Sequence, residues 1–244
     1  MNGYAEDLAH IHASGFSGLA ETAAPVIVRL LDGAGLAGGL VVDLGCGSGI
    51  TSRALTDAGY EVLGIDTSRP LLARARRLAP RARFRHASFL EEPLPRCAAV
   101  IAVGEVLSYT DRSLGPVFAR VRRALRPGGL FVFDLAGPGR VRGGGPVRTW
   151  AQGEDWAILV ESEEDPRRRL LTRRMTTFRR ASRGWRRGTE IHRQRLRSAS
   201  ELAAQLREGG FRVRIRSGYT GERFAPGHYV VVARAIPRRG TGAD

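Results

Sequence analysis

Short apolar runs alternate with segments of helical spacing over the first half of the chain. Glycine and proline turns separate them, and Ser68 can cap one helix that has Pro70 in its first turn. This order predicts an α/β fold in which helices cover both faces of a parallel sheet. The expected strands are 40–44, 61–66, 83–88, 98–106 and 130–135, and the expected helices are 4–13, a stretch ending near 31, 50–58, 70–78 and 113–125.

The alternation of strand and helix stops after Asp134. A glycine-rich connector follows at 137–146, and beyond it the chain reads as extended segments joined by turns, which indicates an inserted antiparallel meander. Ser198 and Glu201 then form a capping box that opens another helix. The meander strands are expected at 156–163, 169–180 and 185–197, the helix ends near 209, two last strands follow at 211–219 and 228–235, and the tail 238–244 is expected to fray.

These elements divide the chain into three parts. We expect a helical cap at 1–32, a core at 33–136 completed by 198–236, and the inserted meander at 137–197. The cap and the meander lie outside the pattern that builds the sheet, and both carry aromatic and histidine side chains. They are therefore expected to close over the strand ends as a lid that selects the substrate. A role in completing the core or in a dimer contact is the alternative.

The composition is that of an ordinary globular protein, with 43% hydrophobic and 26% charged residues in 244. The net charge is +15, and all 39 basic residues are arginine. A GC-rich coding sequence would produce this bias without any selected partner. The stretch 140–197 holds 16 of the arginines, so a patch there could attract an anionic substrate or nucleic acid, with a solvated surface as the alternative.

No apolar run approaches the roughly 20 residues of a membrane helix. The first residues lack the basic and apolar regions of a secretory signal. Cys46 and Cys97 lie in no disulfide framework and in no zinc-binding spacing. We therefore expect a cytoplasmic monomer or homodimer with reduced thiols, no metal site and no membrane segment.

The segment VVDLGCGSG at 41–49 carries the candidate chemistry, because it joins a strand to a helix where an open parallel sheet binds ligands. Gly45, Gly47 and Gly49 allow a tight turn and a close approach of a ligand to the backbone. Asp66 ends the next strand, where a carboxylate can accept hydrogen bonds from both hydroxyls of a ribose. The glycine spacing does not fit the G-x-G-x-x-G of dinucleotide-binding proteins, and the absence of lysine excludes a P-loop.

With VVDLGCGSG, the acid of GIDTS and the segment RALRPGGLFVFD, the sequence resembles the class I S-adenosylmethionine-dependent methyltransferases. The resemblance implies a Rossmann-like, doubly wound, mainly parallel sheet of seven strands with S-adenosylmethionine as cofactor. It also implies that the loop from Gly45 through Cys46, Gly47 and Gly49 holds the methionine part. The other implied contacts are Asp43 with the amino group, Asp66 with the ribose, Leu71, Ser88 and Phe89 with the adenine, and Gly104 and Glu105 toward the methionine and the substrate.

The methyl acceptor is less defined by the sequence. The D/N-P-P-Y type motif of nucleobase and amide methyltransferases is missing, and GEVLSYT at 104–110 takes its place. The cap and the inserted meander resemble the layout of small-molecule methyltransferases, so we expect a small-molecule nitrogen or oxygen acceptor and no nucleic-acid partner. An RNA or protein substrate held by the arginine-rich insert, or cofactor binding without catalysis, are the alternatives.

A general base is optional, because the sulfonium methyl is already activated and the enzyme mainly has to position the acceptor in a dry cavity. The candidates for a proton acceptor are His10, His12, Glu105, Tyr109 and His192. We prefer Glu105, which should face the transferred methyl group, and His12 on the cap. The aromatic residues Tyr4, Phe16, Trp150, Trp156 and Trp185 could wall the acceptor pocket or form local cores of the cap and the insert.

Overall fold

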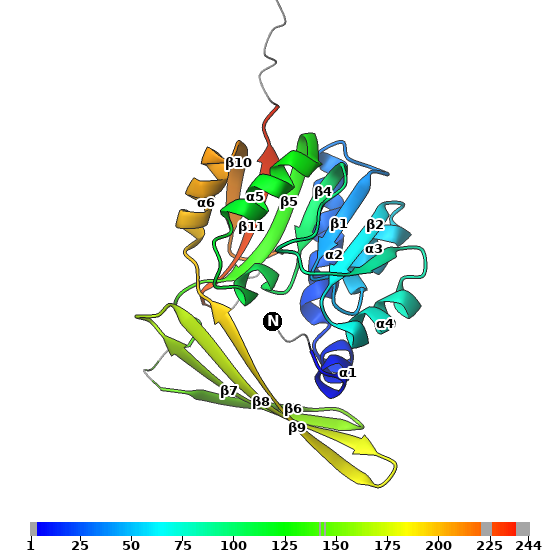
Figure 1. Ribbon diagram of the computed structural model, residues 1–244, viewed down its shortest axis with the longest axis vertical. Helices are drawn as coiled ribbons and strands as arrows, with labels where there is room; N and C mark the ends of the chain where they lie inside the picture. Colours follow the sequence, from blue (N-terminus) through cyan, green and yellow to red (C-terminus); the bar gives the residue numbers. More distant parts are fainter. Residues whose placement is uncertain (1–3, 142, 144, 221–225, 238–244) are drawn as a thin grey trace, which may run out of the picture.

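The computed structural model describes residues 4–141, 143, 145–220 and 226–237. Its centre is a seven-stranded sheet in the order β10-β11-β5-β4-β1-β2-β3 (Figure 1). Strands β1 to β5 run parallel to one another, whereas β11 is antiparallel to both β5 and β10. The strands are β1 Leu40–Leu44, β2 Glu61–Asp66, β3 Arg83–His86, β4 Cys97–Ala102, β5 Leu125–Ala136, β10 Phe211–Arg216 and β11 His228–Ala235.

Helices cover both faces of this sheet. On one face Phe118 of α5 and Leu206 of α6 pack with Phe131 and Phe133 of β5, and all four side chains are buried. On the other face α2 and α3 pack on the strands. Burial on both sides explains why the central strands read as continuous apolar runs. The helices are α1 Glu6–Gly15, α2 Gly18–Gly33, α3 Ile50–Asp57, α4 Arg69–Leu78, α5 Gly115–Ala124 and α6 Ala199–Glu208, with a 3₁₀ helix η1 at Val106–Tyr109.

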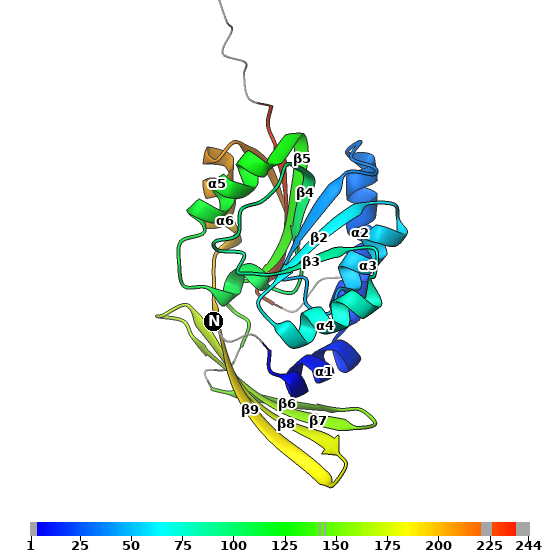
Figure 2. The same ribbon diagram turned by 45° about the vertical axis from the view of Figure 1, so that its right-hand side comes forward.

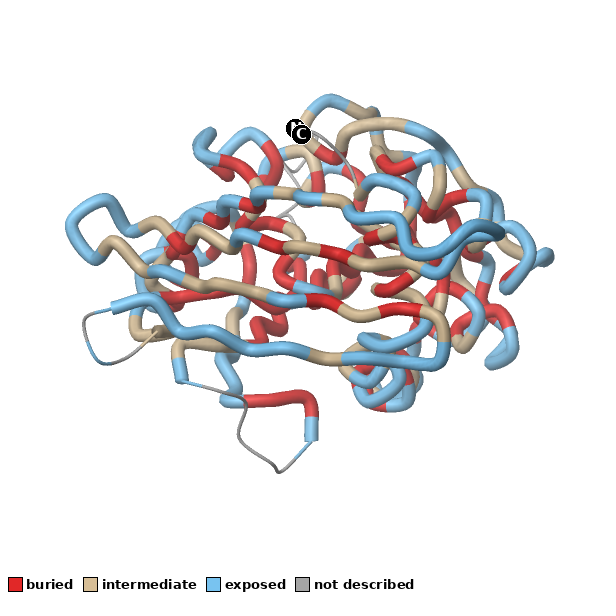
Figure 3. Tube along the Cα trace, turned by 90° about the horizontal axis from the view of Figure 1, so that it is seen from below, coloured by how far each residue is buried: buried red, intermediate tan, exposed pale blue. Residues whose placement is uncertain are grey.

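A second sheet of four antiparallel strands lies at the lower edge of the first in Figures 1 and 2, with α1 between them. Its strands are β6 Val147–Gln152, β7 Trp156–Asp165, β8 Leu170–Ala181 and β9 Gly184–Arg195. Leu8 and Ile11 of α1 pack against Trp156, Ile158 and Met175 on the inner face of this sheet. Seen from below, its strands alternate between exposed and more buried positions (Figure 3), as expected for a sheet with one covered face.

The predicted fold class is confirmed, and the differences are local. The strand expected at 98–106 ends at Ala102, because the chain then turns through Gly104 and Glu105, both with positive φ, into η1. The strand expected at 130–135 starts at Leu125, with an irregular register opposite Cys97. The meander has a fourth strand, β6, which the sequence pattern did not predict because nearly all of its residues are exposed and give no alternation of buried and exposed positions.

Two further expectations concern the chain as a whole. Within the described ranges, no helix combines the length and the apolar character that a membrane crossing needs. The tail 238–244, which was expected to fray, lies outside the described residues.

Candidate active site

A cavity of about 1150 Å³ opens where the carboxyl ends of β1, β2 and β4 face α1 and the four-stranded sheet. Its wall includes Gly45 and Gly47 after β1, Asp66 at the end of β2 and Gly104 after β4. Parallel strands bring their carboxyl ends to one edge, which explains why residues so distant in sequence meet here. Side chains from the cap and from β9 complete the wall, among them Tyr4, His12, Phe16, Ile191 and His192.

The glycine loop has the backbone conformation that the sequence predicted. Gly45 has φ +64°, and a Cβ there would lie 2.6 Å from Val106. Gly49 caps α3 with φ +85°, and a Cβ there would approach Ala75 to 2.9 Å. A larger residue at either position would thus be strained by both its conformation and its neighbour. The loop exposes backbone to the cavity at Gly45 and Gly47.

Asp66 lies on the cavity wall and also holds this loop. Its Oδ2 accepts a hydrogen bond from the backbone N–H of Gly47 at 2.9 Å, and its Oδ1 accepts one from Ser68 at 2.7 Å. Burial raises the pKa of Asp66, although these backbone donors oppose the shift. A carboxylate has about four lone-pair positions, so Asp66 keeps the capacity to accept further hydrogen bonds from a ligand.

The remaining positions implied for the cofactor divide into two groups. Leu71, Ser88, Phe89 and Gly104 lie on the cavity wall. The Ser88 hydroxyl already accepts a hydrogen bond from the N–H of Leu90 at 3.2 Å, which turns the chain after β3.

Asp43, Cys46 and Gly49 lie behind the wall rather than on it. Asp43 is 2% exposed, and its Oδ2 accepts a hydrogen bond from the Ser52 hydroxyl at 2.7 Å. Burial raises the pKa of Asp43 to about 7. Burial likewise raises the pKa of the Cys46 thiol, so this thiol stays protonated at neutral pH. Asp43 can therefore act on a ligand only through the loop in front of it or through water.

The structure brings three of the five candidate bases near one another. The Tyr109 hydroxyl lies 3.5 Å from the Tyr4 hydroxyl and 3.4 Å from Nδ1 of His192. The Tyr4 ring also contacts the rings of His12 and His192 edge-on, at centroid distances of 5.0 and 4.9 Å. On its other side, His192 Nε2 lies 3.2 Å from Oε2 of Glu190. We refer to Tyr4, His12, Tyr109 and His192 as the Tyr-His cluster.

The members of the Tyr-His cluster differ in protonation. Burial raises the pKa of Tyr4 and of Tyr109, so both phenols are protonated at neutral pH. Burial, and after it the nearby His192, lowers the pKa of His12, so this imidazole is neutral. Its Nδ1 is buried and has no hydrogen-bond partner in the described part of the chain. His10 lies elsewhere: it does not line the cavity but lies 3.1 Å from both Asp155 and Arg74.

Comparison with known proteins places this site in a family. A family model described as a methyltransferase domain matches residues 41–129, which include the glycine loop and Asp66. Over 193 residues the chain is 27% identical to YqeM of Bacillus subtilis, a protein that carries the name of a methyltransferase. That match covers 75% of this chain and 77% of YqeM. Several other curated methyltransferases match over about half of their own length or less.

Solved structures share the fold over nearly the whole chain. An S-adenosylmethionine-dependent methyltransferase from Clostridium acetobutylicum has a TM-score of 0.81 at 16% identity, with 94% of this chain and 98% of that one covered. The amino pentose methyltransferase CalS10 from Micromonospora echinaspora has a TM-score of 0.75 at 18% identity, with 97% and 99% covered. The family model and YqeM support a class I S-adenosylmethionine-dependent methyltransferase, and the solved structures support its fold. The resemblance in the glycine loop and Asp66 therefore identified the family correctly.

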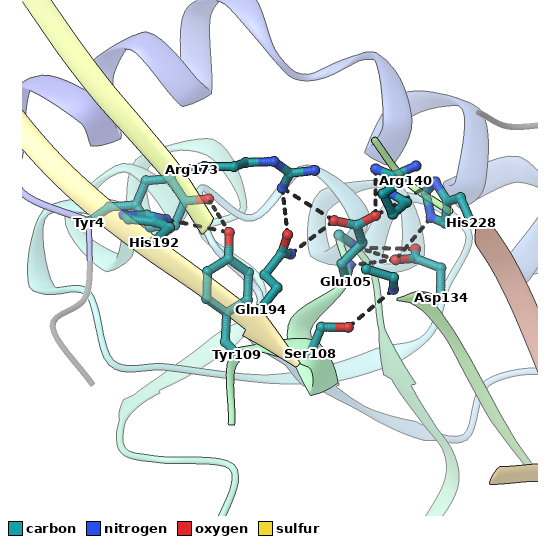
Figure 4. Close-up of polar contacts among 12 residues, drawn as sticks. Tyr4, Glu105, Ser108, Tyr109, Asp134, Arg140, Arg173, His192, Gln194 and His228 are labelled. Carbon is teal, nitrogen blue, oxygen red and sulfur yellow. Dashed lines mark hydrogen bonds and ion pairs between the residues drawn. The ribbon is translucent and has the colours of Figure 1, made fainter. Parts of the chain in front are cut away.

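Glu105 of the methyltransferase lies in a different setting from the one expected. Its carboxylate is buried and does not line the cavity. Arg140 Nη2 lies 2.8 Å from its Oε1, Arg173 Nη1 lies 3.4 Å from its Oε2, and Gln194 Nε2 donates to Oε2 at 2.9 Å (Figure 4). Burial raises the pKa of Glu105, but Arg173 and Arg140 outweigh it, so the pKa is lowered. A carboxylate of low pKa between two guanidinium groups is a poor proton acceptor, so the expected role does not fit this residue.

The methyltransferase has a second buried carboxylate beside Glu105, which the sequence analysis did not single out. Asp134 at the end of β5 is fully buried and accepts hydrogen bonds from the N–H of Gly104 at 3.1 Å and from the Tyr219 hydroxyl at 2.8 Å. It also accepts one from the N–H of Glu105, so it fixes the turn after β4. An acid inside the apolar run LFVFDL is the signal that could have revealed it.

Proposed function

We propose that this methyltransferase transfers a methyl group to a nitrogen or oxygen atom of a small molecule that binds beside the Tyr-His cluster. The observation that carries this proposal is the continuity of the cavity, whose wall includes Gly45, Gly47 and Asp66 as well as the cluster. Its volume of about 1150 Å³ exceeds the roughly 300–1,000 Å³ of a pocket for one ligand. Cofactor and acceptor can thus occupy it together.

The residues predicted to bind the cofactor would divide its parts among them. The loop Gly45-Cys46-Gly47-Ser48-Gly49 would hold the methionine part through its backbone, with Asp43 acting on the amino group from behind the loop. Asp66 would accept the ribose hydroxyls with its free lone pairs. Bare backbone at Gly45, which has no room for a Cβ, supports this assignment. On the adenine side, the proposed residues are Leu71, Ser88 and Phe89, and Gly104 would face the methionine and the acceptor.

When bound, S-adenosylmethionine supplies a methyl group that its sulfonium already activates. The protein then has to hold the acceptor in line at about 3–3.5 Å and to keep water out. Tyr4 and Tyr109 can do both, because they place aromatic rings and protonated hydroxyls on the same wall. Neutral acceptor groups are favoured there, since the two phenols carry no charge.

The acceptor loses a proton during methylation, and two histidines are placed to receive it. His12 presents a neutral ring whose buried Nδ1 has no partner in the described residues. His192 lies between the carboxylate of Glu190 and the Tyr109 hydroxyl, so a proton passed to Tyr109 can move on to an imidazole oriented by an acid. We therefore assign proton acceptance to His12 and His192 in place of Glu105.

An amine-bearing small molecule is supported by the comparison with CalS10, whose name is that of an amino pentose methyltransferase. Side chains of α1 and β9 line the cavity, so a small acceptor could lie between the cap and the four-stranded sheet. The two cysteines are free and buried, which supports a location in the reducing cytoplasm.

An acceptor panel tests the proposed function. Purified protein is incubated with S-adenosylmethionine and amino sugars, small amines, hydroxylated aromatics, a peptide pool or transcribed RNA, and release of S-adenosylhomocysteine is measured. We expect turnover with one small-molecule class and at least a 10-fold loss in Tyr109→Phe. Tyr60→Phe is the matched control, because the Tyr60 hydroxyl bonds Asp32 away from the cavity. Fastest turnover with RNA or peptide would refute the small-molecule assignment.

A further inference from the structure

Part of the cavity wall consists of arginine side chains that the proposed mechanism does not use. Arg112 follows η1, Arg167 and Arg168 lie in the turn between β7 and β8, and Arg193 and Arg195 belong to β9. We call these five residues the arginine wall. Four of them come from the stretch 140–197, whose arginine content stood out in the sequence.

Hydrogen bonds hold the three segments of the arginine wall together. Arg195 Nη1 donates to the carbonyl of Arg168 at 2.6 Å, which ties β9 to the turn before β8. Arg197 Nη2 donates to the carbonyls of Thr110 at 2.6 Å and of Arg112 at 3.0 Å, which ties the end of β9 to the segment after η1. The wall is therefore a built surface with a fixed backbone.

The arginine wall has more positive charge than its neighbours offset. Arg112 lies 3.3 Å from Glu91, and Arg168 lies 3.7 Å from Asp165, both at the surface. In the described part of the chain, Arg167, Arg193 and Arg195 have no carboxylate within ion-pair distance. Asp111 and Glu91 also line this part of the chain's cavity, so the five arginines leave a net positive charge that a bound anion would offset.

We propose that the arginine wall binds a phosphoryl group carried by the methyl acceptor. This inference rests on the proposed function, because it assigns the acceptor's anionic part to one section of the same cavity and its nucleophile to the Tyr-His cluster. Arginine presents a planar fork of donors that fits phosphate oxygens in pairs, and three uncompensated forks suit a group with more than one negative charge. Such a group occurs in nucleotide-linked small molecules and in the phosphopantetheine arm of carrier proteins.

Anion binding to protein saturated with S-adenosylhomocysteine tests this proposal. Pyrophosphate, uridine diphosphate and 4′-phosphopantetheine are titrated by calorimetry at low salt, with uridine as the uncharged control. We expect binding of pyrophosphate and of one organic probe, and the tighter organic probe identifies the source of the phosphoryl group. Arg193→Gln should weaken binding about 10-fold, as the loss of one charge-assisted hydrogen bond does.

Arg187→Gln is the matched control variant. Arg187 lies on the same strand and the same face as Arg193, six residues earlier and thus roughly 20 Å away, and it does not line the cavity. The affinity of the Arg187→Gln variant for the probes should stay within about twofold of the affinity of the parent protein. Equal losses in both variants, displacement of S-adenosylhomocysteine by the probes, or no binding of any probe below 1 mM would each overturn the inference. In each of these results the protein still binds S-adenosylhomocysteine when no probe is present, whereas failure to bind S-adenosylhomocysteine alone would contradict the proposed function.

Discussion

Replacing Glu105 by glutamine tests whether this carboxylate links the two sheets or accepts a proton. The change keeps the shape of the side chain but removes the charge between Arg140 and Arg173. The side chains of Glu105 and Arg140 are only 7% and 13% exposed. Removing one partner of a buried ion pair costs about 3–5 kcal/mol. Arg173 is 25% exposed and can regain water, so we expect the lower end, about 3 kcal/mol.

Thermal unfolding measures this loss. For a chain of this size, 1 kcal/mol lowers the Tm by about 2–4 °C, so Glu105→Gln should lower it by about 6–12 °C. Glu161→Gln is the matched control, because Glu161 also lies between two arginines, Arg148 at 2.9 Å and Arg174 at 3.6 Å, but at the surface. Its loss should stay below about 1 kcal/mol. An unchanged Tm in Glu105→Gln together with a roughly 100-fold drop in turnover would show a general base and refute the structural role.

The pH dependence of the unfolding free energy also tests the structural role of Glu105. The folded pKa of Glu105 is lowered, so the charged carboxylate contributes its full stability above the unfolded value of about 4.3 and loses it as the pH falls through the folded pKa. The difference in unfolding free energy between the parent and Glu105→Gln should therefore be constant from pH 6 to 8. It should shrink below about pH 4.3. A difference that developed only above pH 6 would mean a raised pKa and would contradict the assignment.

Two further predictions concern the two halves of the cavity. Burial raises the pKa of Asp43 to about 7, so this group is about half protonated at pH 7, and placing the cofactor's ammonium group near it should release up to about half a proton. Calorimetric titration in buffers of different ionisation enthalpy measures that release, and an equal release in Asp43→Asn would exclude Asp43 as its source. Deleting residues 1–16 removes Tyr4 and His12, so it should abolish transfer while cofactor affinity stays within a few-fold. Full turnover in a truncated protein with an intact circular dichroism spectrum would remove the cap from the mechanism.

The core and the meeting of the glycine loop with Asp66 at the cavity could be predicted from the sequence because their signals are local. A strand buried on both faces reads as an apolar run, and the loop at 41–49 places its glycines within one turn. Asp66 follows at the end of the next strand, and pairing of β1 with β2 brings it to the loop. Each step needs only neighbours in the sequence and the pairing of adjacent strands.

The acceptor half could not be predicted in the same way because its contacts are distant in the chain. Glu105 meets Arg173 and Gln194, which are 68 and 89 residues away on strands whose register the sequence does not reveal. With 39 arginines in the chain, no pattern singled out the two that pair with Glu105. Strand β6 is an edge strand with little burial, so it lacked the periodicity that identified its neighbours.

The central claim is that the glycine loop and Asp66 form the cofactor site, and titration calorimetry of S-adenosylhomocysteine tests it most directly. Asp66→Ala should weaken binding by about 1.5–3 kcal/mol, or roughly 10- to 150-fold, since it removes a charged acceptor that also holds the N–H of Gly47. Asp57→Ala, which alters an exposed acid paired with Arg53 and Arg81, should leave the affinity unchanged. Unchanged binding by Asp66→Ala, or a preference of the parent protein for a nicotinamide dinucleotide, would contradict the account.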